Sequence, residues 1–216
     1  MSKLKLHGYF RSGAAYRVRI ALNLKGLSYD QASVHLRRGE QFSAAFSKLN
    51  PAHLVPALED GPEVLRQSLA IIEYLEETHP EPPLLPSDPA GRARVRALAY
   101  DIACDIHPID NLRVMVYMEK ILGLDQKARD AWYAHWIRLG FEAIEATLAR
   151  GAGTGRFCHG DAPTLADVCL IPQLGNAARV NLDLTPYPTI RRIAGECRKL
   201  EAFQRAEPQN QPDAEA

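Results

Sequence analysis

The chain has 216 residues, enough for one large domain or for two modest domains that each bury a core. Its 26 Lys and Arg residues balance 26 Asp and Glu residues, so no net field favours nucleic acid or an anionic membrane, and we expect neither as a partner. No apolar run is long enough to cross a bilayer, and residues 1–7 lack the apolar stretch of a secretory signal. We therefore expect a cytoplasmic protein.

The first part of the chain predicts a small α/β domain over residues 1–83. Apolar and polar residues alternate over 3–9, which indicates a strand; 14–25 predicts a helix ended by Gly26, and 29–36 a second strand. Two more short strands over 50–58 and 63–65, and a helix over 68–78, complete the region. This βαβ-ββα order, with the second strand pair antiparallel, resembles the thioredoxin-like fold.

A proline-rich joint divides the chain, because proline lacks the amide hydrogen that a helix or central strand needs. We place a linker over 84–91 and an all-helical domain over 92–216. Helical spacing begins at residue 92 and recurs over 127–148. Thr164-Leu165-Ala166-Asp167 reads as a variant capping box, which steadies a further helix. The polar, proline-bearing end predicts a frayed, disordered tail from about residue 207.

The four cysteines, Cys104, Cys158, Cys169 and Cys197, are widely separated and form no C-x-x-C pair. Metal or redox use normally shows close pairs. We expect reduced, mostly buried thiols and no metal site.

The most informative segment covers residues 50–75. Val55 precedes Pro56, so it favours extended geometry, and its peptide bond to proline can be cis at low cost. A cis bond would turn the Val55 main chain outward, where it could pair with an extended ligand. Ser68 precedes an apolar helical set and reads as an N-cap, where free amides favour a carboxylate. A proline turn and a capped surface helix explain the same residues without a ligand.

Together with Gln67, this segment resembles the glutathione site of the cytosolic glutathione transferases. The segments 9–12, 17–22, 67–77 and 183–190 resemble the zeta class of that family, and the match runs from about residue 4 to about 212. The resemblance implies a thioredoxin-like N-terminal domain with an all-α C-terminal bundle, glutathione as cofactor, and a homodimer. It implies that Val55 and Pro56 bind the cysteinyl main chain, and that Gln67 and Ser68 hold the γ-glutamyl end.

Chemistry is expected after the first strand, where a thioredoxin-like domain places its reactive residue. This position reads Arg11-Ser12-Gly13-Ala14 and contains no cysteine, so thiol exchange by the protein is excluded there. The resemblance assigns Ser12 to hydrogen-bond the glutathione sulfur and so to favour its thiolate. The usual zeta pattern at these positions is Ser-Ser-Cys, so Ser12 is the only hydroxyl left, and Gly13 allows close backbone approach. A helix cap also explains Ser12.

The zeta resemblance implies cis-trans isomerisation of maleylacetoacetate or maleylpyruvate in tyrosine or aromatic-compound catabolism. Such dicarboxylates need cations, and arginine matches a carboxylate in bidentate fashion. Arg11, beside Ser12, is a catalytic and substrate-binding candidate. Arg113 and Arg179 are further substrate candidates, although ordinary surface charge explains them equally well.

Three more residues match glutathione contacts in the family. His107 and Asn111 are four residues apart and are expected to share one helix face. Gln41 lies in a predicted loop. Without the resemblance, Gln41 would be an unremarkable loop residue, and a single histidine such as His107 is more often structural.

Two alternatives to the isomerase stay open. A glutathione transferase that conjugates or dehalogenates small α-halo acids would use the same Ser12 and arginines. A non-catalytic glutathione-binding protein is the third candidate, against which Ser12 and the set Val55, Gln67 and Ser68 argue. The sequence does not choose between the two maleyl acids, which differ mainly in their tails.

Overall fold

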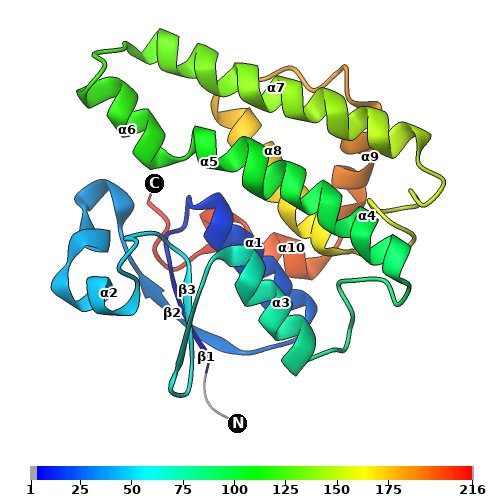
Figure 1. Ribbon diagram of the computed structural model, residues 1–216, viewed down its shortest axis with the longest axis horizontal. Helices are drawn as coiled ribbons and strands as arrows, with labels where there is room; N and C mark the ends of the chain where they lie inside the picture. Colours follow the sequence, from blue (N-terminus) through cyan, green and yellow to red (C-terminus); the bar gives the residue numbers. More distant parts are fainter. Residues whose placement is uncertain (1–3, 216) are drawn as a thin grey trace. The chain divides into compact units, whose positions relative to one another are not determined.

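The computed structural model describes residues 4–215, which form two compact units (Figure 1). The first unit combines the chain up to Leu84 with the C-terminal segment from Arg198, and the second covers Leu85–Cys197. The expected boundary near 84–91 lies close to this division. The segment from Arg198, which the sequence analysis assigns to the helical domain, instead packs with the first unit, because α10 (Glu201–Ala206) contacts α1 (Gly13–Leu24).

The first unit is built on a four-stranded mixed sheet with the order β2-β1-β3-β4. Its strands are β1 (Leu4–Gly8), β2 (Tyr29–Ser33), β3 (Ala57–Asp60) and β4 (Glu63–Arg66). β1 runs parallel to β2 and antiparallel to β3, and β3 runs antiparallel to β4. This confirms the thioredoxin-like prediction. The strand expected over 50–58 is wrong in its bounds, because Asn50 Nδ2 donates to Leu54 O at 2.6 Å and closes a turn before β3.

Helices cover both faces of this sheet. Successive strand residues point to opposite faces: Leu6 and Gly8 face α1, where Gly8 lies against Ala15, whereas the His7 ring lies 6.2 Å from the Phe46 ring of α2 (Ala44–Leu49). No helix was predicted at α2. The remaining helices of the unit are η1 (Leu36–Arg38), η2 (Glu40–Phe42), α3 (Ser68–Thr78) and η4 (Pro208–Asn210).

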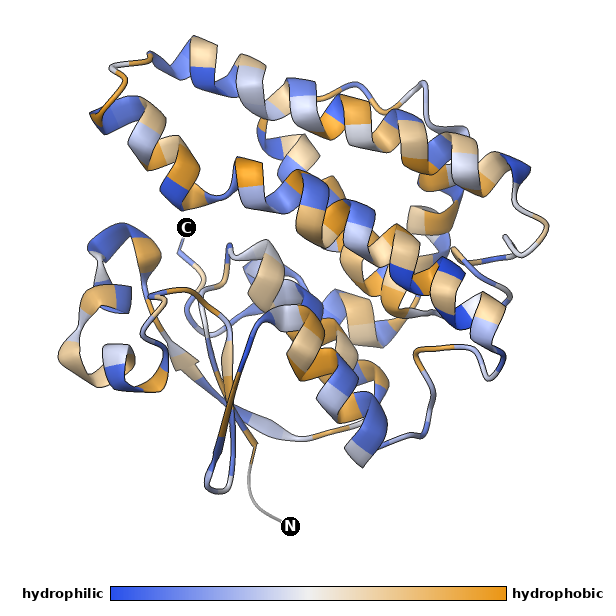
Figure 2. Ribbon diagram, viewed as in Figure 1, coloured by the Kyte–Doolittle hydropathy of each residue, from blue (hydrophilic) through white to orange (hydrophobic). Residues whose placement is uncertain are grey.

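The second unit is helical throughout, as expected. It contains α4 (Pro89–Tyr100), the π-helical segment η3 (Asp101–Ile106), α5 (His107–Asp110), α6 (Leu112–Lys120), α7 (Gln126–Arg150), α8 (Leu165–Arg179) and α9 (Pro188–Cys197). α7 alternates between apolar and polar positions (Figure 2), and its buried residues recur every three or four positions: Tyr133, Ile137, Phe141, Ile144 and Leu148. Between residues 4 and 215, no helix is long and apolar enough to span a membrane.

The predicted capping box opens the most deeply buried helix of this unit, α8. Asp167 Oδ2 accepts hydrogen bonds from Thr164 N at 2.8 Å and from Thr164 Oγ1 at 2.9 Å. Asp167 Oδ1 accepts from Cys158 N at 2.9 Å. Burial raises the pKa of the Asp167 carboxyl, and these donors act against that rise. The box therefore joins the loop before α8 to its first turn.

We expect Thr164→Ala to lower the free energy of unfolding by about 1–2 kcal/mol, because the variant loses the N-cap hydroxyl at a buried helix start. Urea denaturation measures this change. Thr147→Ala is the control, since Thr147 is exposed in the last turn of α7 and alanine is the better helix former there. Equal losses in the two variants would contradict a stabilising role for the box.

The frayed tail expected from about residue 207 is wrong for the described residues. η4 follows α10, and the side chain of Gln211 is buried at 5% exposure. Gln211 Nε2 donates to Arg205 O at 2.8 Å and to Glu207 O at 2.7 Å. The polar composition suggested disorder, but these polar groups form hydrogen bonds with one another and with β2 of the neighbouring sheet.

Candidate active site

The sheet register brings three connecting segments together at one edge of the first unit. His7 of β1 pairs with Ala57 of β3, and Ala57 pairs with Arg66 of β4. β1 ends one residue after His7, β3 begins at Ala57 and β4 ends at Arg66. The segments 9–12, 55–56 and 67–68 therefore meet at this edge, and they carry most of the predicted site residues.

Ser12 is the N-cap residue of α1. Its Oγ accepts the Ala15 N–H at 3.2 Å. A serine hydroxyl can accept and donate at the same time, and across residues 4–215 we find no acceptor for the Ser12 hydroxyl hydrogen. The cap bond thus fixes Oγ beside the positive end of the helix and leaves its hydrogen for a ligand. Ser12 can therefore cap α1 through its oxygen and donate its hydroxyl hydrogen to a ligand at the same time.

Val55 presents an unpaired main chain. Its bond to Pro56 is cis, and neither its N–H nor its C=O has a hydrogen-bond partner within the described part of the chain. The Val55 side chain packs in an apolar cluster with Phe10 and Phe46. The peptide group is thereby held in place with both polar atoms available, as pairing with an extended ligand requires.

The helix start at Gln67 and Ser68 is shifted by one residue from the predicted cap position. Gln67 is the N-cap of α3, with φ 70° and no side-chain capping bond, and Ser68 is the first helical residue. The predicted N-cap at Ser68 is therefore wrong by one residue, because Gln67 has left-handed geometry that lies outside the helix. Ser68 is buried, and its N–H belongs to the first turn of α3, where amides lack partners inside the helix.

Arg17 is a residue of this edge that the sequence analysis did not select. Arg17 is 2% exposed, and its Nη1 donates to Ser68 Oγ at 3.4 Å. A buried positive charge beside the start of α3 adds to the attraction for a carboxylate. The available signal was a pair of arginines, Arg17 and Arg19, within the otherwise apolar middle of α1.

Gln41 is buried in η2, and its Oε1 has no hydrogen-bond partner among the described residues. Its backbone carbonyl accepts from His53 Nδ1 at 3.0 Å, which fixes the segment. Gly13, the first residue of α1, is buried, and Arg11 is half-buried. These three complete the predicted site residues of the first unit.

The other four predicted residues belong to the second unit. His107 begins α5, but Asn111 is extended (φ −74°, ψ 165°) and is the N-cap of α6, where its Oδ1 accepts Val114 N–H at 3.3 Å. The expected shared helix face is therefore wrong, because the helix stops between the two residues. Arg113 in α6 and Arg179, the last residue of α8, are both exposed.

Asp110 is a second unpredicted feature, at the end of α5. Its side chain is 2% exposed, and neither carboxyl oxygen has a hydrogen-bond partner within residues 4–215. Burial raises the pKa of Asp110 to about 8. No sequence signal distinguished this carboxyl from the surface ones.

All four cysteines are free and lie in the second unit, so the sheet edge has no thiol of its own. Cys158, Cys169 and Cys197 are buried and Cys104 is exposed, which confirms the prediction of mostly buried thiols. Burial raises the pKa of Cys158 well above its ordinary value. A thiol reaction at this edge needs a thiol from a ligand.

Two family models match the chain: "Glutathione S-transferase, N-terminal domain" over residues 6–83 and "Glutathione S-transferase, C-terminal domain" over residues 130–202. A maleylpyruvate isomerase from Ralstonia sp. is 53% identical over 211 residues, which cover 98% of this chain and 100% of the relative. A probable maleylacetoacetate isomerase from Vibrio cholerae is 53% identical over 216 residues, covering 99% and 100%.

Solved structures agree over the same length. A zeta-class bacterial maleyl pyruvate isomerase has a TM-score of 0.96 at 53% identity and covers 98% of this chain and 100% of its own. A maleylacetoacetate isomerase from Methylobacterium extorquens AM1, with bound malonate and GSH, has a TM-score of 0.95 at 44% identity with the same coverage. This chain belongs to the glutathione S-transferase family and, within it, to the zeta class of maleylacetoacetate and maleylpyruvate isomerases.

Proposed function

We propose that this protein is a glutathione-dependent cis-trans isomerase that converts maleylacetoacetate or maleylpyruvate to the fumaryl isomer. The observation that carries the proposal is the full-length similarity, at 53% identity, to one relative named for each of these activities. Because both relatives match equally well, both acids are candidate substrates. The location that suits this reaction is the cytoplasm, within aromatic-compound or tyrosine catabolism.

Glutathione fits the residues at the sheet edge. Val55 offers an unpaired N–H and C=O to a peptide, and the buried Gln41 Oε1 offers an acceptor to an amide. The start of α3, with Ser68 and the adjacent Arg17, offers donors and positive charge to a carboxylate. The M. extorquens relative binds GSH. Pro56, Gly13 and Gln67 complete the proposed site in this unit. His107 and Asn111 stay proposed glutathione contacts on the family resemblance alone.

When bound, glutathione supplies the thiolate nucleophile that makes rotation about the cis double bond possible. The protein's part is to favour that charge. Ser12 Oγ–H donates toward the sulfur position, and the amides and dipole at the start of α1 stabilise negative charge there. Both effects favour the charged form of a thiol and therefore lower its pKa.

The substrate's carboxylates require cations. Arg11 follows the same strand as Ser12 and is one residue away from it, so we assign it to the carboxylate nearest the reacting carbons. Arg113 and Arg179 are the proposed partners for the distal carboxylate. The M. extorquens relative binds the dicarboxylate malonate, which is consistent with an anion-binding role for such residues.

The assay incubates the protein with each maleyl acid, with and without glutathione, and follows the loss of the cis enol absorbance. We expect turnover that requires glutathione, with total thiol unchanged at the end of the reaction. Stoichiometric consumption of thiol would support the conjugation alternative instead. Absence of turnover with both acids would refute the isomerase proposal.

Gln41→Ala tests the proposed glutathione contact. We expect the KM for glutathione to rise about five- to tenfold, the equivalent of one neutral hydrogen bond, with kcat nearly unchanged. The free energy of unfolding without glutathione should fall only by the packing of the lost methylene groups, because the buried Oε1 has no hydrogen bond to lose. Gln209→Ala, an exposed glutamine in the same unit, is the control. A stability loss without a change in KM would show a structural role instead.

We also propose a homodimer, as the zeta resemblance implies. Light scattering behind gel filtration tests it directly, since a dimer has twice the 24.0 kDa mass of the chain. A single 24.0 kDa species at micromolar concentration would contradict it.

A further inference from the structure

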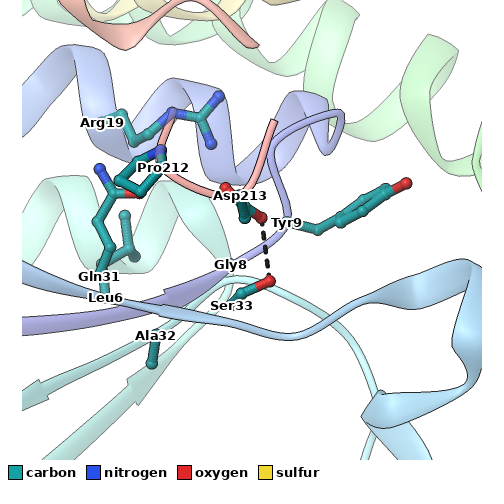
Figure 3. Close-up of a pocket in the computed structure, with 9 residues that line it drawn as sticks. All are labelled: Leu6, Gly8, Tyr9, Arg19, Gln31, Ala32, Ser33, Pro212 and Asp213. Atoms are coloured by element: carbon teal, nitrogen blue, oxygen red, sulfur yellow. Dashed lines mark hydrogen bonds between the residues drawn. The ribbon is translucent and has the colours of Figure 1, made fainter. Parts of the chain in front are cut away.

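The C-terminal segment lies across the ends of β1 and β2. Gln211 anchors its turn: besides its bonds to Arg205 and Glu207, its Oε1 accepts from Gln31 Nε2 of β2 at 3.0 Å. Residues 212–215 then continue past the strand ends (Figure 3). The chain's last described residues are therefore held against the first unit, close to where β1 leads into the Ser12 loop.

Asp213 makes the central contacts of this segment. Its Oδ2 accepts the Phe10 N–H at 3.0 Å and the Ser33 Oγ–H at 3.1 Å, the second of which Figure 3 shows as a dashed line. One carboxylate oxygen thus joins the residues that follow β1 to the last residue of β2. Phe10 is two positions before Ser12, and Ser12 N donates to Tyr9 O at 2.9 Å.

The other side of the Phe10 residue is held by Arg19. Arg19 Nη2 donates to Phe10 O at 3.1 Å, and Nε donates to Ala206 O, at the end of α10, at 3.0 Å. Burial lowers the pKa of Arg19 to about 10. Because this value is still well above neutral pH, the guanidinium stays charged. The Phe10 N–H and C=O are therefore both bound by charged side chains, and hydrogen bonds to charged groups are stronger than neutral ones.

The segment combines one apolar contact with these polar contacts: Ala214 packs against the apolar cluster that contains Tyr9 and Phe10. A cavity of about 190 Å³ separates the segment from the strands. Figure 3 shows its lining: Leu6, Gly8, Tyr9, Arg19, Gln31, Ala32, Ser33, Pro212 and Asp213. Asp213 supplies the side-chain hydrogen bond from this segment to Phe10, so removing its carboxylate removes that polar link to the Ser12 loop while the Ala214 contact remains.

A second, weaker contact reaches the segment that leads to Gln41. Glu215 Oε1 lies 3.0 Å from His35 Nε2 and 2.7 Å from Arg38 Nη2. His35 Nδ1 accepts the Arg38 N–H at 3.1 Å, so Nε2 carries the hydrogen that is donated to Glu215. Glu215 and Arg38 are largely exposed, and such pairs contribute little. Asp213 is the stronger anchor.

We propose that Asp213 is a positioning residue for the active site: through the Phe10 N–H it fixes the loop that places Ser12 Oγ. This inference rests on the role proposed for Ser12. It gives the C-terminal segment a part in catalysis although Asp213 itself touches neither cofactor nor substrate.

The test compares Asp213→Ala and Asp213→Asn with the parent in the full-length protein. The pKa of the enzyme-bound glutathione thiol is read from thiolate absorbance during a pH titration without maleyl substrate, and kcat and KM are measured separately. For Asp213→Ala we expect the thiol pKa to rise by about half a unit to one unit, and kcat to fall about five- to tenfold. The KM for glutathione should change less than twofold. Asp213→Asn keeps an acceptor oxygen and should recover most of both quantities.

Glu201→Gln, an exposed side chain on α10, is the control and should match the parent. If Asp213→Ala fails to fold, Asp213→Asn carries the test, with a small upward shift in thiol pKa expected. A lower melting temperature with unchanged thiol pKa and kcat would overturn the proposal. Because the thiol titration uses no maleyl acid, failure of the isomerase assay would leave this result interpretable.

Discussion

Ser12→Ala is expected to lower kcat about 100-fold, which corresponds to about 2.7 kcal/mol in activation free energy. The variant removes the hydroxyl at the start of α1, whose hydrogen has no acceptor in the described chain and can therefore serve a thiolate. The pKa of the bound thiol should rise by one to two units. Such a rise is of the same order in free energy as the loss in rate. The KM for glutathione should change less than threefold, because the peptide is held by other residues.

Ser12 also caps α1, so the rate effect has to be separated from a loss of stability. Ser43 supplies the matched control: it is the N-cap of α2, and its Oγ accepts the Phe46 N–H at 3.3 Å. Both alanine variants should lose about 1 kcal/mol of unfolding free energy, but only Ser12→Ala should lose activity. Ser12→Thr, which keeps a hydroxyl and a capping oxygen, should retain much of kcat. Equal activity of Ser12→Ala and the parent would remove Ser12 from its role.

The elements with strong local signals were predictable from sequence. α3 has the predicted bounds, and α7 differs by one or two residues at its ends, because apolar periodicity and helix starts are local properties. The capping box at Thr164 was likewise predictable, because its signal lies within four consecutive residues. The tail was mispredicted because its order comes from contacts with residues about 180 positions away, such as Gln31 and Ser33, which no local pattern contains.

Some residues of the candidate site could likewise be predicted from the sequence, and others could not. Ser12, Val55 and Ser68 were selected from motif and resemblance, and the β1-β3-β4 register brings their segments to one edge. Arg17 and Asp213 were missed, because each acts through a tertiary contact. The helix break at Asn111 was missed as well: the spacing of four predicted one face, but Asn111 caps a new helix with its own side chain.

Asp110 is expected to make the second unit less stable as the pH rises. Its folded pKa of about 8 exceeds the unfolded value of 3.8. Below 3.8 the carboxyl is protonated in both states; between 3.8 and 8 only the unfolded state releases the proton. The unfolded state then binds fewer protons, so the free energy of unfolding falls across this window and levels off above it. The contribution is present at low pH and lost as pH rises through the folded pKa.

Asp110→Asn removes this titration. The unfolding free energy of the variant minus that of the parent should grow by on the order of 2–4 kcal/mol between pH 5 and pH 8. Urea denaturation at several pH values measures it. An amide at this position is also buried without a partner and costs about 1–3 kcal/mol, but that cost does not depend on pH, so the slope of the difference is the diagnostic quantity.

Glu142→Gln, which removes an exposed carboxyl on α7, should give a difference that is nearly flat with pH. A flat difference for Asp110→Asn as well would mean that the Asp110 carboxyl is ionised in the folded protein. That outcome would refute the prediction, which rests on a carboxyl whose two oxygens have no partner within residues 4–215.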